Sequence, residues 1–226
     1  MATTIDEQAL LKLLQLTSPA LPVGAFSYSE GLETLVVQGR LRDSAMLHDW
    51  LVQELRYGSV RLDAAIATRA HQHLNNPHQL AYWNQWLTAS RDTAELRQQS
   101  WQMGRALVRL VNALHPELKP TFAACGTNCN FAVAFGMIAA HWQIAPSTMA
   151  LGYVQSWATN LIGAAVKLVP LGQTDGQRCL LQLIPELRSA VADMVTLEDE
   201  QLYISGWGSA ISSMQHETLY TRLFRS

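Results

Sequence analysis

The sequence predicts an all-α protein: a single domain, residues 1–226, folded as a bundle of roughly nine or ten helices. Apolar residues recur at three- and four-residue spacings through most of the chain, which is the period of an amphipathic helix. No alternating run of apolar and polar residues indicates a strand, and no repeat or low-complexity linker divides the chain. Because 49% of the 226 residues are hydrophobic, the chain can bury one sizeable core.

Residues 146–173 are predicted to form the central helix. Their apolar side chains cover every face of a helix rather than one stripe, which is typical of a helix surrounded by others. Pro146 suits a first turn, and Pro170 with Gly172 ends the helix. Lys167 stands near the carboxyl end, where the helix dipole favours a cation. Polar residues such as Asn160 interrupt the apolar run, so we expect a buried helix rather than a membrane span.

Start and stop signals place the other helices. Residues with short polar side chains favour N-caps, whereas glycine and proline end helices. Before the central helix, the predicted helices are residues 6–17, Ser27 or Ser29 to Gln38, Asp43 or Ser44 to Gly58, 62–73, a short helix after Pro77, 92–115 and 131–142. Residues 18–24 predict a stiff apolar loop, and residues 120–130 a loop or a short helix. After the central helix we expect a helix beyond Gly176 that bends near Pro185, a turn at residues 206–208 and a last helix from about Ser209.

Composition narrows the class of protein. Only 15% of the residues are charged, against about 25% in an average protein, which indicates that partners cover part of the surface. The formal net charge of −2 argues against a nucleic-acid-binding protein. Three cysteines, an odd number, and an N-terminus without a signal-peptide pattern lead us to expect a cytoplasmic location.

No pattern predicts a catalytic, cofactor or metal site. Residues 172–176 hold two glycines, but they follow a helix and lack the lysine of a phosphate-binding loop. His71 and His73 would point about 200° apart on a helix, and Cys125, Cys129 and His141 form only a weak metal-ligand pattern because free cysteines are commonly buried. Without a nucleophile motif either, the sequence favours an interaction protein over an enzyme.

The C-terminal residues 216–226 carry a different signal. Tyr220, Leu223 and Phe224 alternate with Arg222 and Arg225 in a segment too short to bury itself. Aromatic residues and arginine are the residue types that anchor interfaces. We interpret the segment either as a final helical turn on its own domain or as a tail that docks on a partner.

Three motifs resemble the signatures of the UreF-type urease accessory proteins. They are SPALPVGAFSYSEGLE at residues 18–33, AAVKLVPLGQ at residues 164–173 and HETLYTRLFRS at residues 216–226, in the family's order and at its spacing. The segments RDTAELRQQSWQMG, residues 91–104, and NFAVAFG, residues 130–136, resemble less strict parts of the family. The resemblance extends over nearly the full chain.

This resemblance implies an all-α, homodimeric maturation chaperone that is not an enzyme. It implies that the protein binds a UreD-type accessory protein, also called UreH-type, and recruits and regulates a UreG-type GTPase that carries nickel to apo-urease. Partners then handle the nickel and the GTP, so we expect no cofactor in this chain. The resemblance also implies that the C-terminal tail becomes ordered on the UreD-type partner.

The expected contact residues follow from the three motifs. The partner-binding candidates are Glu33, Lys167, His216, Glu217, Tyr220, Arg222, Leu223, Phe224, Arg225 and Ser226, and the N-terminal motif contributes Pro22, Gly24, Phe26, Tyr28 and Gly31. Glu30 stands where the family often has Gln or His, which makes Glu33 the firmer candidate. Two alternatives stay open: an all-α enzyme with Cys125 or Cys129 as nucleophile, and a homodimeric scaffold unrelated to a GTPase.

Overall fold

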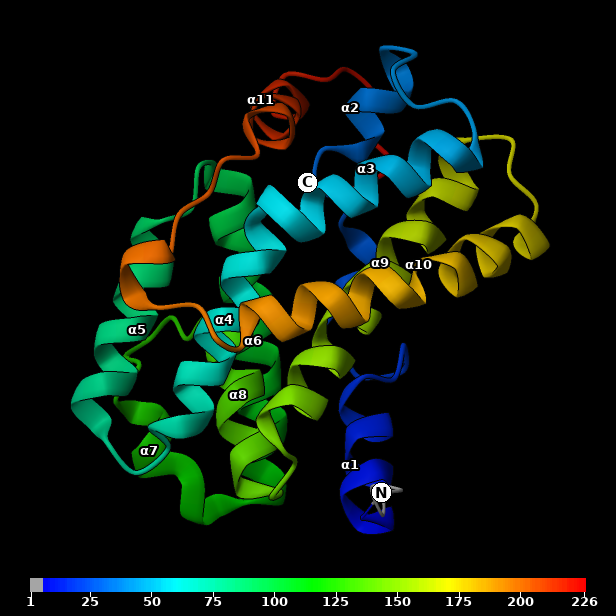
Figure 1. Cartoon of the computed structure of the whole chain (residues 1–226). Helices are drawn as coiled ribbons and strands as arrows, with labels where there is room; N and C mark the ends of the chain where they lie inside the picture. Colours follow the sequence, from blue (N-terminus) through cyan, green and yellow to red (C-terminus); the bar gives the residue numbers. More distant parts are fainter. Residues whose placement is uncertain (1–5) are drawn as a thin grey trace.

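The computed structural model describes residues 6–226, and that part of the chain contains helices and no strand (Figure 1). The α-helices are α1 (Glu7–Leu16), α2 (Leu32–Val37), α3 (Ser44–Tyr57), α4 (Ser59–Gln72), α5 (Pro77–Ala89), α6 (Ala94–Leu114), α7 (Lys119–Ala123), α8 (Phe131–His141), α9 (Pro146–Leu168), α10 (Gln173–Met194) and α11 (Trp207–His216). Three short 3-10 helices are η1 (Ala25–Ser27), η2 (Pro116–Leu118) and η3 (Asp199–Gln201). The all-α prediction is confirmed, and nine or ten helices is close to the eleven described.

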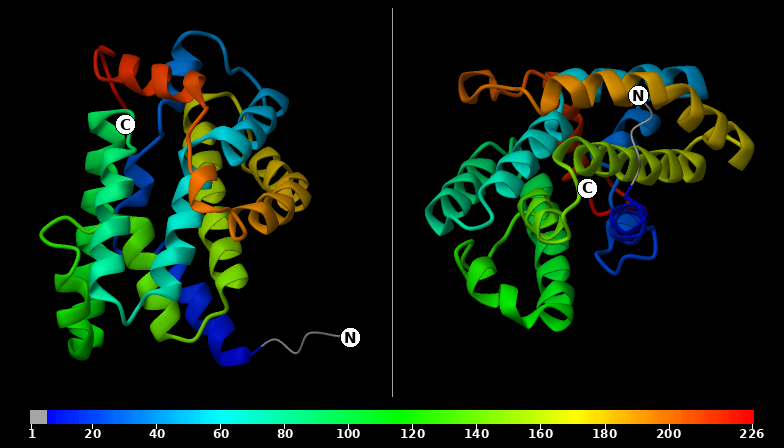
Figure 2. Two further views of the ribbon diagram at one scale, coloured as in Figure 1. Left: turned by 60° about the vertical axis from the view of Figure 1, so that its left-hand side comes forward. Right: turned by 60° about the horizontal axis from the view of Figure 1, so that its bottom comes forward.

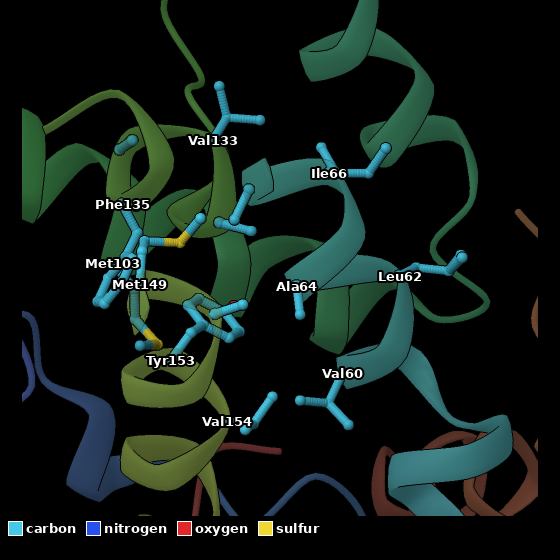
Figure 3. Packing of buried hydrophobic residues seen from close by; sticks show 14 of the residues in the cluster. Val60, Leu62, Ala64, Ile66, Met103, Val133, Phe135, Met149, Tyr153 and Val154 are labelled. Atoms are coloured by element: carbon cyan, nitrogen blue, oxygen red, sulfur yellow. The ribbon is translucent and has the colours of Figure 1, made fainter. Parts of the chain in front are cut away.

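The core lies between α4, α6, α8 and α9 (Figure 3). Phe135 on α8 meets Tyr153 on α9 edge to face, with ring centroids 5.1 Å apart. Gly136 lets α8 and α4 approach closely, since a Cβ there would lie 2.1 Å from the Ala67 carbonyl oxygen. Helix α9 packs against α10, α4, α2, α8, α1 and α3, so the predicted central helix is central (Figure 2).

Several helix starts follow the capping chemistry of the sequence. Asp6, Asp43 and Asn76 accept hydrogen bonds from backbone N–H groups in the first turns of α1, α3 and α5. Helix α6 begins two residues later than predicted, because Thr93 rather than Asp92 supplies the cap by accepting from the Leu96 N–H.

The predicted second helix is shorter than its sequence signal. Gly24, Glu30 and Gly31 have φ values of 76°, 53° and 81°, and such left-handed residues cannot continue an α-helix. The segment therefore forms η1, then a turn, then α2. Gly31 has a second reason to be glycine: a Cβ there would lie 2.8 Å from the Ser213 backbone nitrogen of α11.

One C-terminal prediction is wrong. Residues 206–208 do not form a turn, because α11 starts at Trp207 with Gly206 as its N-cap. Helix α10 covers the outside of the bundle, and its Leu181 and Ile184 are 68% and 43% exposed. No helix in residues 6–226 is long and apolar enough to cross a membrane.

Candidate interaction site

The tail, defined as residues 217–226, follows α11 and runs back along the N-terminal motif. The Arg225 N–H donates to the Ser27 carbonyl at 2.9 Å, and the N–H and hydroxyl of Ser29 donate to the Ser226 oxygen at 2.7 and 2.6 Å. Phe224 is 6% exposed and Ser226 is fully buried. The segment therefore packs on its own domain, where neighbouring backbone supplies partners for its polar groups.

Glu33 holds the tail through its carboxylate. One oxygen accepts the Leu223 N–H at 2.7 Å, and the other accepts the Phe224 N–H at 3.0 Å and contacts His216 Nε2 at 3.1 Å. Glu33 lies in the first turn of α2, where the helix dipole favours an anion, and it is only 4% exposed. A buried carboxylate needs such donors, so the tail and α2 depend on each other.

His216, at the end of α11, lies between two carboxylates. Its Nε2 faces Glu33, and its Nδ1 lies 2.9 Å from an oxygen of Glu95. A neutral imidazole carries only one N–H, so both contacts are hydrogen bonds only when the ring is protonated. Arg222 then donates to the other Glu95 oxygen at 2.9 Å. We call this cluster of Glu33, Glu95, His216 and Arg222 the tail clasp.

Lys167 reaches the same region from the last turn of α9. Its ammonium lies 5.7 Å from the centre of the Phe224 ring, within the range of a cation–π contact. The structure thus brings together Glu33, Lys167 and the tail, although Glu33 lies 134 residues before Lys167 and the tail begins 50 residues after Lys167.

The outer side of the tail is exposed. Tyr220 is 97% and Leu223 is 63% exposed, and Glu217, Arg222 and Arg225 are exposed beside them. Trp207, Ile211 and Met214 extend this apolar surface onto α11. The predicted partner-binding residues therefore divide into a buried set that fixes the tail and an exposed set on its outer side, of which Arg222 already contacts Glu95.

The N-terminal motif also divides in two. Tyr28 is buried and its hydroxyl donates to Gln102 of α6 at 2.7 Å, and Gly31 packs on α11. Pro22 and Phe26 are exposed, and Gly24 supplies the left-handed turn between them. Part of the motif therefore supports the tail, and part lies on the surface.

A cavity of about 270 Å³ adjoins this site, between the loop of residues 16–26, α6 and α9. Lys167 lines it, and Glu30 forms part of its wall. Glu30 accepts from Trp157 Nε1 at 2.9 Å and from Gln99 Nε2 at 2.7 Å. Gln99 in turn accepts the Ser226 hydroxyl at 2.6 Å, which links the cavity wall to the tail.

Deeper in the cavity, Asp63, Arg91 and Tyr153 form a buried group. Arg91 donates to one oxygen of Asp63, and the Tyr153 hydroxyl donates to the other at 3.2 Å. Burial raises the pKa of Asp63, and the Arg91 guanidinium opposes this rise. Burial likewise raises the pKa of Glu30, although hydrogen bonds from Trp157 and Gln99 lower it. The cavity lining thus combines the carboxyl groups of Glu30 and Asp63 with the Arg91 guanidinium and with apolar side chains.

Sequence reasoning missed Glu95, Gln99 and Asp63. The first two lie on the polar first half of α6, at a four-residue spacing that puts them on one face. That polar half was visible in the sequence, but nothing indicated that the chain's last residues cover it. Asp63 stands in an alanine-rich helix with no local partner, so its pairing with Arg91 is purely tertiary.

Comparisons with known proteins agree on one family. A family model described as UreF matches residues 41–184. A urease accessory protein UreF of Nostoc sp. is 52% identical over 226 residues, covering 99% of each chain. The protein of that name in Microcystis aeruginosa is 51% identical over 98% of this chain, and that of Alkalilimnicola ehrlichii is 40% identical over 95%. The relatives thus extend over the N-terminal motif and most of the C-terminal region, which the family model leaves out.

Proposed function

The chain belongs to the UreF family of urease accessory proteins, and from this premise we propose that it is a nickel-insertion chaperone that joins a UreD-type protein to a UreG-type GTPase. It binds the UreD/UreH-type accessory protein, recruits and regulates the GTPase, and so promotes nickel delivery to apo-urease. It works in the cytoplasm as a homodimer, catalyses no reaction itself, and leaves nickel and GTP to its partners.

The tail is the observation that carries this proposal. Glu33 accepts hydrogen bonds from its backbone at Leu223 and Phe224, while the side chains of Tyr220 and Leu223 project from it. Large exposed apolar side chains next to arginine are the composition of an interface centre. A fixed backbone lowers the conformational entropy lost on binding, so these side chains suit docking on the UreD-type protein.

Lys167 is proposed to act at the contact that regulates the GTPase. It is exposed, it is the only cation near the Phe224 ring among the described cation–π pairs, and it stands between the tail and the cavity. A GTPase contact at this position would sense whether the tail is in place.

The first test is gel filtration with light scattering of the chain alone and mixed with the UreD-type protein and the nucleotide-loaded GTPase. We expect a homodimer alone and a discrete ternary complex in the mixture. Failure to assemble with both soluble partners and GTP present would refute the scaffold role.

Variants sharpen this test. Tyr220→Ala with Leu223→Ala is expected to weaken binding to the UreD-type protein at least about tenfold, because exposed anchors of this kind contribute 1 kcal/mol or more each, in rough terms. Tyr82→Ala is the matched control, since Tyr82 is 53% exposed on α5, away from the tail. If both variants bind the UreD-type protein with the same affinity, the tail is not part of the interface.

Lys167→Ala is expected to lower urease activation, measured as nickel-dependent urease activity in a reconstituted mixture, more than it lowers the melting temperature. Normal activation with an unchanged melting temperature would remove Lys167 from the regulatory contact.

A further inference from the structure

His115, Glu117 and His141 form a cluster on the surface, where α6 and α8 end. His115 is the C-cap residue of α6, His141 is the last residue of α8, and Glu117 lies in η2 directly after α6. Their side chains are 27%, 28% and 60% exposed, respectively, so solvent reaches all three. Helices α6 and α8 end near α7, away from α11 (Figures 1 and 2).

The spacing of the polar atoms matches a metal coordination shell. One Glu117 oxygen lies 3.2 Å from His115 Nδ1 and 3.5 Å from His141 Nε2, and all three ligand atoms lie within 4.8 Å of one another. Ligands bonded to one ion at about 2.1 Å are about 3 to 3.4 Å apart. Only a small side-chain rotation is therefore needed to place three ligands around one ion.

The charge state of the cluster also suits a cation. Burial lowers the pKa of His141 and the neighbouring His115 adds to this, while Glu117 opposes it, so the net shift favours the neutral imidazole that a metal ion requires. The pKa of Glu117 is lowered by its own backbone N–H and by the two histidines, so the group is a carboxylate. The carboxyl ends of α6 and α8 both carry partial negative charge at this point.

We propose that His115, Glu117 and His141 bind a divalent transition-metal ion of the zinc, nickel or copper type. Two imidazole nitrogens and one carboxylate oxygen are ligands of intermediate softness that select these ions over magnesium or calcium. The exposure of Glu117 leaves room for water at the remaining positions. This site is independent of the tail clasp and of the proposed partner contacts.

In the metal-free protein, Trp142 makes a hydrogen bond that opposes metal binding. Its indole N–H donates to His115 Nε2 at 3.0 Å, which requires a lone pair on Nε2 and puts the proton on Nδ1, where Glu117 accepts it. A metal ion on Nδ1 requires the other tautomer, with the proton on Nε2. Metal binding therefore moves a proton across the ring and breaks the contact with Trp142. The Lys12 ammonium, which lies 3.5 Å from the Trp142 carbonyl, also opposes metal binding, because it repels a cation.

Titration calorimetry of the full chain with zinc chloride tests the proposal. We expect one site, and we expect Glu117→Gln and His141→Ala each to lower the affinity at least about tenfold, since even loss of an outer contact costs that much. His78→Ala, an exposed histidine on α5, is the control and should leave binding unchanged. Circular dichroism checks that each variant is folded. Unchanged zinc affinity in both ligand variants would overturn the proposal.

Trp142→Phe supplies a test that a merely structural cluster would not pass. Removing the indole donor should raise the zinc affinity about threefold or more, because no hydrogen bond is lost on binding. Nitrogen-15 spectra should show His115 changing from the Nδ1–H to the Nε2–H tautomer as zinc is added. An unchanged tautomer would count against ligation by His115 Nδ1.

Cobalt chloride distinguishes the proposed site from the buried cysteines. Cys125, Cys129 and Cys179 are free thiols and could hold an ion after a local opening. Binding at the proposed site gives only weak visible bands, whereas thiolate ligands add intense charge-transfer absorption near the ultraviolet. Such absorption on cobalt binding would place the ion on cysteine and overturn the proposal.

Discussion

Buried carboxyl groups are the most unusual single residues of this protein. Glu30, Glu54 and Asp63 all have a raised pKa, and in each case burial is the main cause. Asp63 is compensated by Arg91, whereas burial brings the pKa of Glu54 to about 8 despite a hydrogen bond from Ser209. The Glu54 carboxylate also fills the space over Gly58, where a Cβ would lie 2.1 Å from it.

Replacing Glu54 tests how this group links stability to pH. An acid with a raised folded pKa holds its proton in the folded state after the unfolded chain has lost it. The free energy of unfolding therefore falls as pH rises from about 4.5 to about 8, with a slope of up to about 1.4 kcal/mol per pH unit. We expect Glu54→Gln to remove this contribution and to be more stable than the parent protein above pH 8.

Urea unfolding followed by tryptophan fluorescence from pH 5 to pH 9 measures this difference. Glu200→Gln is the control, because Glu200 is exposed. The same pH dependence in Glu54→Gln and the parent protein would show that Glu54 is ionised in the folded state.

Among the elements, α11 and the tail are attached mainly by polar contacts. The tail clasp joins α2, α6 and α11, and Phe224 is the one large apolar side chain of the tail that is buried. Polar clusters of this kind are stable only when complete, since removing one member leaves buried charges without partners. The tail therefore behaves as a unit that is either docked or detached.

His216→Ala is expected to detach the tail. It removes the imidazole that contacts both Glu33 and Glu95, and leaving a buried polar group without its partner costs about 1–3 kcal/mol or more. The tail can relieve this cost by opening locally, so the rest of the domain stays folded. Limited trypsin digestion with mass spectrometry should show faster cleavage after Arg222 and Arg225.

His78→Ala provides the reference for this digestion, since that histidine lies on α5 and contacts no part of the clasp. Cleavage in the tail at the parent rate in His216→Ala would show that Phe224 and the backbone hydrogen bonds hold the tail without the clasp.

At the scale of the whole molecule, α9 joins the N-terminal and C-terminal halves. It contacts α1, α2, α3 and α4 from the N-terminal half of the chain, and α8 and α10 from the C-terminal half. Helices that share one core in this way unfold together, because no subset buries its apolar surface alone. The predicted single domain, residues 1–226, is thus expected to have one unfolding transition.

Coincident urea transitions by circular dichroism and by tryptophan fluorescence would support this single domain. The seven tryptophans are spread from Trp50 to Trp207 and so report on most of the chain. Two separate unfolding midpoints would show that parts of the chain unfold independently.

The sequence alone determined the fold class, most helix positions and the family. Helical periodicity and capping residues act over three or four residues, so they can be recognised without a structure. The three motifs were sufficient for the family because they are contiguous. Only the structure showed which residues of the motifs contact one another. Glu33, Glu95 and His216 lie far apart in the chain, and only tertiary packing brings them together. The same holds for His141, which pairs with His115 and Glu117 rather than with the cysteines. Burial of a tail and the meeting of distant side chains depend on long-range packing, and no local pattern encodes it.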